Sequence, residues 1–600
     1  MSAPRGVRRP AGRRAVLLTS TVAAGLAVLL ALAGCAGSAG PAETAATTPA
    51  GAATVLPTDK PGGTLRVVTD AMPTGDPGWA STTADRAFAR LVSRTLYSYP
   101  ASADVDSAVV ARPDLAVSAP QRSPNGLVIT VRLSSSARWD TPTPRRIVAN
   151  DVARGLKRLC LPPAPSPMRG YFAATIVGFD AYCTELFTKP ADQLKDFIEN
   201  RSPAGIEVVS NTDIAFHLIR PYTDFVDLLA LPEAAPVPVE ADDYLPNSPD
   251  YLSHLISDGP YHLTNAAGGV YSFGKDGQWN RSIDGIRKAL PDHITITSGV
   301  APAVAQAEIE AGKADITLDA AVPLDRASAL FKASDQRLSV PTTGSDLFLT
   351  VGMHGPAGAA LGNQDVRDAL ATCVDRIAVV EALGDPPFAS AATQLLQPTM
   401  TGYSPLDPFP TPNGAGDATT CGDGLAKAPG GPVTELTLLT TDSTTDAAVA
   451  GALADTFAKV GVKLVVEAKA QPDFDVAAVS PLQQSWDLAL TTVTPLWYGD
   501  AGRTVFQPLF DSAWVGQRPV DGGYDAKEVM DTMSVALQAP TPASRAAAWG
   551  VLESTVLRDV AVIPLAVSYE PRFHSTSVLS FNEVPSVGTA DPTDLALGPA

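Results

Sequence analysis

The sequence predicts a mixed α/β fold built on open sheets, and two observations lead to this prediction. Short runs typical of strands recur from residue 63 towards the C-terminus, with helical patterns between them. Between residues 435 and 467 a strand, an amphipathic helix and a second strand follow one another directly, as in open α/β sheets. No internal repeat of fixed period is evident, so a repeat architecture is not predicted.

The N-terminus predicts export. Residues 1–14 contain five arginines and no acidic residue, and residues 15–33 form an almost uninterrupted apolar run. The run is of borderline length for a transmembrane helix, but the basic start and the small residues at its end favour a cleaved signal peptide over residues 1–34. The run ends in Leu32-Ala33-Gly34-Cys35, which resembles the lipobox of bacterial lipoproteins. We therefore expect Cys35 to carry a lipid anchor on the extracytoplasmic face of the cell membrane; a buried structural cysteine is the alternative.

Composition separates a tether from a folded region. Residues 35–61 are rich in Ala, Thr, Gly and Pro, which predicts a flexible spacer. Loss of the first 34 residues takes the formal net charge from −19 to −24, and no basic patch is visible, so nucleic acid is excluded as a partner. The remaining chain of about 540 residues is long enough for two to four domains.

Individual elements can be placed in chain order. Residues 63–68 predict the first strand, and residues 126–133 alternate apolar and polar side chains as a half-buried strand does. Asn150 is predicted to cap a helix that continues to Leu159. The later unit is predicted as a strand, a helix and a strand over residues 435–440, 445–460 and 462–467.

The cysteines support an oxidising compartment. If Cys35 is lipidated, an even number remains, which suggests two disulfides. Three pairings are possible, and we favour the pairs nearest in sequence: Cys160 with Cys183, and Cys373 with Cys421. None of these cysteines has metal-ligand spacing and the six histidines are scattered, so neither a metal site nor a cofactor is expected.

Several short motifs, in order along about nine-tenths of the chain, resemble the extracellular solute-binding proteins that include the oligopeptide-, dipeptide- and nickel-binding components of ABC transporters. The most specific match is Asp365-Val366-Arg367-Asp368-Ala369-Leu370 followed by Asp375-Arg376. The other matches are Pro61 to Val67, Asp76-Pro77, Pro113 to Ala116, Asn150-Asp151-Val152, Asp258 to Tyr261, Trp279-Asn280, Glu308 to Asp315, Gly461-Val462, Trp486-Asp487 and Arg558 to Leu565. Two positions depart from the pattern: a turn glycine is absent after Asp140, and an expected asparagine is replaced around Gly352-Met353.

The resemblance implies a two-lobed periplasmic-binding-protein-like fold of type II, with an extra subdomain in the N-terminal lobe. One lobe is expected to combine residues 62–97, 205–295 and 561–600, with residues 98–204 as the extra subdomain. The other lobe is expected over residues 296–560. Closure on a ligand is expected to bend the chain near Pro291 to Ile294 and Ile563 to Leu565.

The same resemblance places a ligand site at Trp497, Tyr498, Gly499 and Asp500. In dipeptide-binding members an aspartate at the matching position holds the α-ammonium of the ligand, and aromatic side chains cover the peptide. An enclosed carboxylate without a cation is costly, so such a site selects a cationic group. The alternative is a surface-loop aspartate beside packed aromatic residues.

The resulting expectation is a substrate-binding lipoprotein of an ABC importer, not an enzyme. The expected partners are a small peptide or similar solute, the permease subunits, and the membrane through the lipid anchor; a monomer is expected. One alternative is a repurposed homologue that acts as a scaffold or regulator in the cell envelope. An enzyme is a third possibility, but the sequence has no G-x-S-x-G elbow and no zinc motif.

Overall fold

The computed structural model describes residues 59–480, 484–514 and 518–598, all within the unit that runs from Leu56 to Ala600. The predicted signal peptide, Cys35 and most of the predicted tether lie outside the described residues. Within the described ranges, no helix has both the length and the apolar character needed to cross a bilayer.

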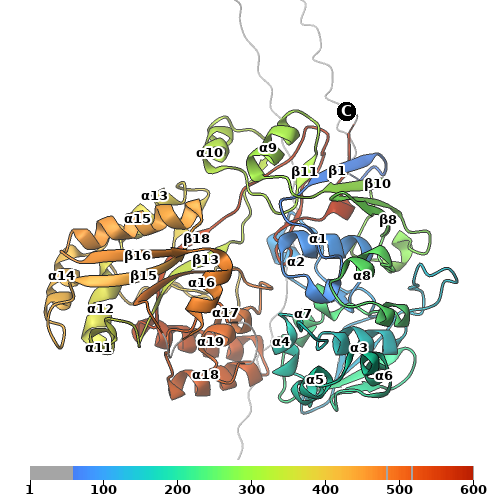
Figure 1. Cartoon of the computed structure of the whole chain (residues 1–600), viewed down its shortest axis with the longest axis horizontal. Coiled ribbons are helices and arrows are strands. Elements are labelled where there is room, and N and C mark those ends of the chain that lie inside the picture. Colours follow the sequence, from blue (N-terminus) through green and yellow to red (C-terminus); the bar gives the residue numbers. More distant parts are fainter. Residues whose placement is uncertain (1–58, 481–483, 515–517, 599–600) are drawn as a thin grey trace, which may run out of the picture. The chain divides into compact units, whose positions relative to one another are not determined.

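One sheet has five strands in the order β11-β1-β10-β9-β8. Strand β1 (Thr64–Val68) occupies the predicted first strand and pairs in parallel with β10 (His293–Thr297) and β11 (Ile316–Thr317). The hairpin β8 (Tyr261–Ala267) and β9 (Val270–Lys275) completes it. Helix α1 (Thr83–Val92) lies beside this sheet (Figure 1), with Phe88 packed edge-on against Tyr271 and Phe273.

A four-stranded antiparallel sheet, β4-β5-β7-β6, lies in the region predicted as the extra subdomain. Its strands are β4 (Gln121–Arg122), β5 (Val128–Arg132), β6 (Ile206–Val208) and β7 (Asp213–His217). Since β6 and β7 pair here, this sheet extends beyond the predicted limit at residue 204. The helices of the region are α3 (Ala149–Arg158), α4 (Arg169–Ala173), α5 (Phe179–Phe187) and α6 (Leu194–Asn200).

The predicted start of α3 is wrong by two residues. The helix begins at Ala149 after Val148, and Asn150 is not its cap. Asp151 explains the difference, because its carboxylate accepts a hydrogen bond from the Val148 backbone N–H at 3.0 Å. The acidic side chain at the third helical position thus accepts a hydrogen bond from the backbone N–H of the cap residue, Val148.

The second large sheet has six strands in the order β14-β18-β13-β17-β15-β16. The predicted strand–helix–strand unit is present as β15 (Glu435–Thr441), α15 (Thr444–Ala458) and β16 (Lys463–Lys469), with β15 and β16 parallel. The other strands are β13 (Ser345–Val351), β14 (Ala389–Ala391), β17 (Leu488–Val493) and β18 (Val562–Ser568). These two sheets confirm the mixed α/β prediction.

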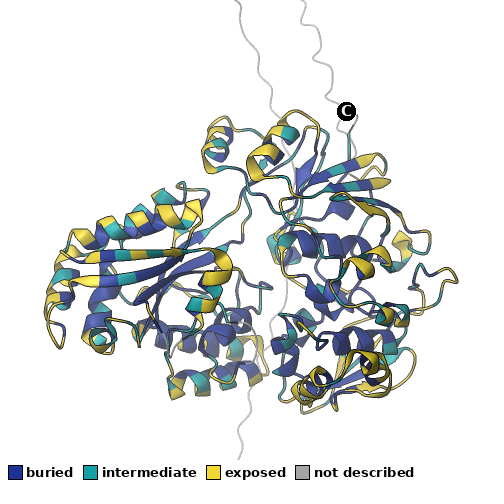
Figure 2. Cartoon of the chain, viewed as in Figure 1, coloured by how far each residue is buried: buried dark blue, intermediate teal, exposed yellow. Residues whose placement is uncertain are grey.

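Most helices near the second sheet fall into two groups, and four others complete the region. Figure 1 shows α13 (Arg376–Ala382) and α15 along the strands β15 and β16, and Figure 2 shows exposed residues on both helices. The central strands β18, β13 and β17 are largely buried. The second group is α17 (Gly502–Phe510), α18 (Lys527–Gln538) and α19 (Pro542–Arg558), which pack on one another. The remaining helices here are α11 (Gly358–Leu361), α12 (Gln364–Cys373), α14 (Ala418–Ala426) and α16 (Gln471–Ala478).

We call residues 345–568 the second lobe and the other described residues the first lobe. The chain passes from β12 (Leu338–Ser339) to β13 and returns from β18 to β19 (Arg572–Phe573), and β12 pairs with β19. The passages are therefore residues 340–344 and 569–571. The first lobe also contains α7 (Phe225–Leu228), α9 (Pro302–Glu310), α10 (Leu324–Lys332) and the short elements β2 (Tyr97–Ser98), α2 (Val105–Ala108), β3 (Arg112–Pro113), α8 (Pro249–Ser253), β20 (Glu583–Val584) and β21 (Thr589–Ala590).

Sheet membership differs from the predicted division at both crossovers. Residues Pro291 to Ile294 lead into β10, and Ile563 to Leu565 lie inside β18, so neither segment is a free connection between the sheets. Residues 316–317, predicted in the second lobe, pair with β1, and β18, predicted in the first, pairs with β13. The sequence motifs mark strand cores, which are rich in apolar residues, and not the short irregular segments between them.

The two disulfides of the described chain are Cys160–Cys183 and Cys373–Cys421, the pairing favoured from the sequence. The first joins the end of α3 to α5 in the four-stranded region, and both of its cysteines are buried. It closes a loop with a sequence separation of 23 residues.

Replacing Cys160 and Cys183 together by alanine is expected to lower the free energy of unfolding by about 3 kcal/mol, because the unfolded chain regains the freedom of that loop. Urea unfolding followed by circular dichroism measures the loss, with the wild type in the same oxidised state as control. A double variant that unfolds at the wild-type urea concentration would contradict this expectation.

Buried acids make stability depend on pH. Glu553 is buried in α19, and its carboxylate accepts hydrogen bonds from the backbone N–H groups of Leu395 and Leu396, each at 2.7 Å. Burial raises the pKa of Glu553 to about 7 although these hydrogen bonds oppose the shift. The folded chain therefore holds a proton that the unfolded chain has released between about pH 4.5 and pH 7, so this group's contribution to stability falls as the pH rises through that window.

Glu553→Gln is accordingly expected to lose less stability than the wild type between pH 5 and pH 8. Glutamine keeps an acceptor oxygen for the two N–H groups but does not titrate. Thermal unfolding of both proteins at pH 5, 6, 7 and 8 makes the comparison. Identical pH dependence in the two proteins would show that Glu553 keeps an ordinary pKa.

Candidate functional site

The predicted site residues follow strand β17 on the loop that leads into α17. Gly499 adopts a left-handed conformation with φ of 77°, which turns the chain between Tyr498 and Asp500. Its carbonyl oxygen accepts a hydrogen bond from the Thr401 backbone N–H at 2.6 Å. This hydrogen bond ties the loop to Thr401, and the four predicted residues lie in different environments.

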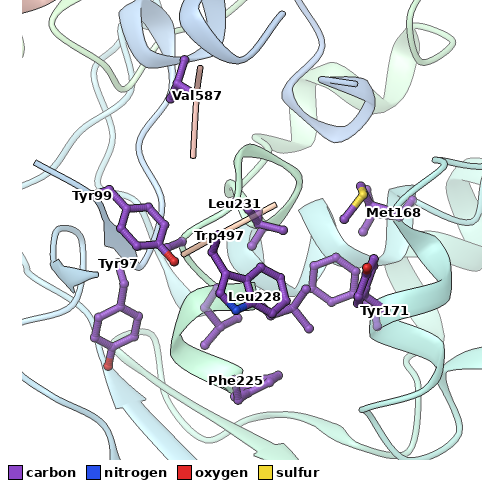
Figure 3. Close-up of a cluster of buried hydrophobic side chains, with 14 of the residues drawn as sticks. Tyr97, Tyr99, Met168, Tyr171, Phe225, Leu228, Leu231, Trp497 and Val587 are labelled. Atoms are coloured by element: carbon purple, nitrogen blue, oxygen red, sulfur yellow. The ribbon is translucent and has the colours of Figure 1, made fainter. Parts of the chain in front are cut away.

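Trp497 is completely buried. Figure 3 shows its indole among Phe225, Leu228 and Leu231 of the first lobe, with Tyr171 beside it. The rings of Tyr171 and Trp497 meet edge-on with centroids 5.9 Å apart, and the indole N–H donates to the Asp500 carbonyl oxygen at 3.0 Å. In this state Trp497 joins the second lobe to the apolar core of the first.

Tyr498 contacts the segment by which the chain enters the second lobe. Its buried hydroxyl donates to the carbonyl oxygen of Gly344 at 3.1 Å, and Gln397 donates to the same oxygen at 2.8 Å. Tyr498 also lines a small cavity of about 80 Å³ together with Gly344, Glu570 and other residues of the two passages. The residue therefore connects the site loop with the interlobe passages.

Asp500 is paired within the protein. Its carboxylate lies 2.7 Å from the Arg545 guanidinium of α19 and accepts a hydrogen bond from the Thr223 hydroxyl of the first lobe at 3.3 Å. Both charged side chains are mostly buried. Burial raises the pKa of Asp500, and the charge of Arg545 opposes that shift. Arg545 thus occupies the position beside the carboxylate that a cationic ligand group would need.

A larger cavity lies beside this loop. Its volume is about 400 Å³, within the range of small-molecule sites. First-lobe residues Ser81, Arg86, Met168 and Tyr171 line it. The second-lobe residues that line it include Asp475 and Arg518, and from β17, the site loop and α17 Thr492, Val493, Thr494, Leu496, Thr504, Val505, Pro508 and Leu509. The walls come from both lobes, so a solute held here would contact both.

Arg503 of α17 connects the lobes next to this cavity. Its guanidinium donates to the Tyr171 carbonyl oxygen at 3.1 Å and to the Thr175 hydroxyl at 2.6 Å, and it lies 3.6 Å from the Asp224 carboxylate. It also stacks over the Tyr222 ring at 4.5 Å. With 1% of its side chain exposed, this arginine is part of the interlobe core.

Sequence reasoning missed the first-lobe wall of the cavity. Met168 and Tyr171 lie on or next to α4 in a stretch that matches no family motif, and their placement depends on the packing of α4 against Trp514 and Trp497. Arg503 follows the predicted site by three residues, but only the tertiary structure shows that it reaches the first lobe. The sequence could have pointed to Arg503 only through its position three residues after Asp500.

Among residues 59–480, 484–514 and 518–598, no group of three or more His, Cys, Asp and Glu side chains is arranged to hold a metal ion.

Comparisons with known proteins agree with this architecture. The clavulanic acid biosynthesis oligopeptide binding protein 2 is 25% identical and superposes with a TM-score of 0.80 over 90% of this chain and 97% of its own. The Escherichia coli murein tripeptide binding protein MppA is 19% identical, with a TM-score of 0.66 over 90% and 98% of the two chains. The Helicobacter pylori binding protein DppA, in complex with the peptide STSA, is 17% identical, with a TM-score of 0.67 over 90% and 99%.

A search of curated proteins found no match. The model of the bacterial extracellular solute-binding proteins, family 5, matches residues 110–515, which is more than half of the chain. This span contains the predicted site loop, the interlobe arginine Arg503 and most of the cavity wall. The chain belongs to the bacterial extracellular solute-binding proteins of family 5.

Proposed function

We propose that this protein captures a peptide or a similar solute between its two lobes and delivers it to the permease of an ABC importer, without chemical turnover. The observation that carries the proposal is the cavity of about 400 Å³ whose walls come from both lobes. A solute bound there favours the state in which the lobes are together, because only that state offers both walls. Relatives whose names describe oligopeptide and tripeptide binding support the choice of peptides.

The proposal includes attachment to the membrane through a lipid on Cys35, as the Leu-Ala-Gly-Cys sequence suggests. A tether over residues 35–61 allows the folded part to reach a permease in the same membrane. Metabolic labelling with a fatty acid, compared between the wild type and Cys35→Ala, tests this part. Equal label in both proteins would remove the lipid anchor from the proposal.

Capture is tested by mass spectrometry of solute released when the purified protein is unfolded, followed by calorimetric titration with the solute found. The expected result is a defined peptide or related solute that rebinds with one site per chain. A protein that releases nothing, binds no member of a peptide library and co-purifies with an envelope protein would favour the scaffold or regulator function instead.

A further inference from the structure

The charged groups that line the cavity are in different states of pairing. Asp475 of α16 accepts a hydrogen bond from the Gln471 amide at 2.7 Å. Arg518 donates to the Asp511 carbonyl oxygen and lies 3.8 Å from the Asp521 carboxylate. Arg86 of α1 lines the same cavity, and within the described chain its guanidinium forms no hydrogen bond and no ion pair.

Two acids near Arg86, Asp85 and Glu233, form no ion pair with it. Its neighbour Asp85 accepts hydrogen bonds from the Thr74 and Thr82 backbone N–H groups and from the Thr82 hydroxyl, which together fix the start of α1. Glu233 is 2% exposed and forms no ion pair with Arg86; burial raises the pKa of Glu233 to about 7, although the charge of Arg86 opposes the shift. Neither acid supplies Arg86 with a hydrogen-bonded carboxylate.

An arginine in this condition favours an anionic ligand group. The Nε atom of Arg86 is buried without a hydrogen-bond partner, so part of the guanidinium has lost water without replacing its hydrogen bonds. A carboxylate matches the planar fork of a guanidinium with two parallel hydrogen bonds. A ligand carboxylate beside Arg86 would therefore supply the hydrogen bonds that the guanidinium lacks within the folded chain.

Asp500 and Arg86 differ in their pairing, and this difference bears on whether the ammonium or the carboxylate end of a solute is bound. Asp500 already has Arg545 at 2.7 Å, whereas within the described chain no carboxylate forms an ion pair or a hydrogen bond with Arg86. We infer that the cavity selects solutes that carry a carboxylate, and that Arg86 is the residue that binds it. This inference rests on the proposed capture function and specifies its ligand class: the α-ammonium of a peptide contributes less to recognition than its carboxylate.

Calorimetric titration with matched probes tests the inference. The probes are tri-alanine and tetra-alanine, their C-terminal amides and their N-acetyl derivatives. The wild type is expected to bind each free acid at least tenfold more tightly than its amide, and N-acetylation is expected to change affinity less than amidation does, because a hydrogen bond to a charged group is worth a factor of ten or more. Arg86→Gln should bind acid and amide alike.

Two further variants make the result specific. Arg86→Lys keeps the charge without the planar fork and should retain part of the preference for the acid. Arg132→Gln removes an arginine with a side chain that is 68% exposed, far along the chain on β5, and should leave all affinities unchanged. Thermal unfolding checks that each variant folds.

The outcomes separate the inference from the function on which it rests. Equal affinity of the wild type for acid and amide, or an undiminished preference in Arg86→Gln, overturns the role of Arg86 while capture stands. If N-acetylation abolishes binding instead, the ammonium is the recognised end. If no probe binds, the solute released from the purified protein decides: one without a carboxylate overturns the inference, and the absence of any solute overturns capture itself.

Discussion

Arg503→Met is expected to lower the free energy of unfolding by about 4 kcal/mol. The substitution removes the two hydrogen bonds to Tyr171 and Thr175 and leaves the Asp224 carboxylate buried without its nearby cation. Breaking a buried ion pair from one side costs about 3–5 kcal/mol, far more than the pair itself contributes. Urea unfolding measures the loss, and weaker solute binding is expected with it because the contacts join the two lobes.

The pH dependence of this effect gives a sharper test. Burial raises the pKa of Asp224 to about 6, although the charge of Arg503 opposes the shift. At pH 5 Asp224 can take up a proton, and a neutral carboxyl group tolerates the loss of Arg503. At pH 8 the buried group must either stay ionised without Arg503 or bind a proton against the solution pH, and both states cost free energy. The loss of stability caused by Arg503→Met should therefore be larger at pH 8 than at pH 5. Arg503→Met combined with Asp224→Asn should recover part of the loss.

Lys527→Ala serves as the control, because Lys527 forms an ion pair with Asp531 in which both side chains are well exposed. Exposed pairs contribute about 0–1 kcal/mol, so this variant should unfold close to the wild type. If Arg503→Met behaves like Lys527→Ala at pH 8, the interlobe contacts of Arg503 do not stabilise the fold.

Asp114→Ala is expected to cost about 5 kcal/mol, at the upper end of the range for a broken buried pair. Asp114 accepts hydrogen bonds from Arg94 and Arg287, each at 2.8 Å, and all three side chains are almost completely buried. Without Asp114, both buried guanidinium groups are left with Asp284 as their ion-pair partner, 3.6 Å from Arg94 and 3.2 Å from Arg287.

The matched comparison is Arg132→Ala, which breaks the exposed pair with Asp213 on the four-stranded sheet and should cost less than about 1 kcal/mol. Asp114→Asn keeps one acceptor oxygen and should fall between the two. Urea unfolding of the three variants in parallel checks the order. Equal losses for Asp114→Ala and Arg132→Ala would mean that water reaches the Arg94–Arg287 pair when Asp114 is removed.

The elements with strong local patterns were predictable. The strand at 63–68 and the unit at 435–467 appear as β1 and β15–α15–β16 because apolar periodicity and burial coincide there. The start of α3 was not, because Asp151 reaches back to Val148 and so moves the helix boundary. Sequence patterns carry no information on such a side-chain contact until the helix is built.

The site was predictable only as a loop. The resemblance identified Trp497 to Asp500, and this loop does border the interlobe region, but the partner of Asp500 is Arg545, 45 positions later on helix α19. Arg86 is equally hidden, since an arginine on an amphipathic helix is most often a solvated residue. Its lack of a hydrogen-bonded carboxylate follows from the positions of Asp85 and Glu233, which only the folded chain determines. The ligand-binding role of Asp500, Trp497, Tyr498 and Gly499 stays a prediction.

The passages between the lobes have a consequence for how this molecule can be taken apart. The second lobe is one uninterrupted stretch of chain, and its first and last residues, Ser345 and Ser568, are direct partners across β13 and β18. A piece whose two ends meet can be excised, or inserted into another protein, without stretching the chain. Residues 345–568 are therefore suited to separate production and segmental isotope labelling, provided that the apolar surface around Trp497, which the first lobe normally covers, is made polar.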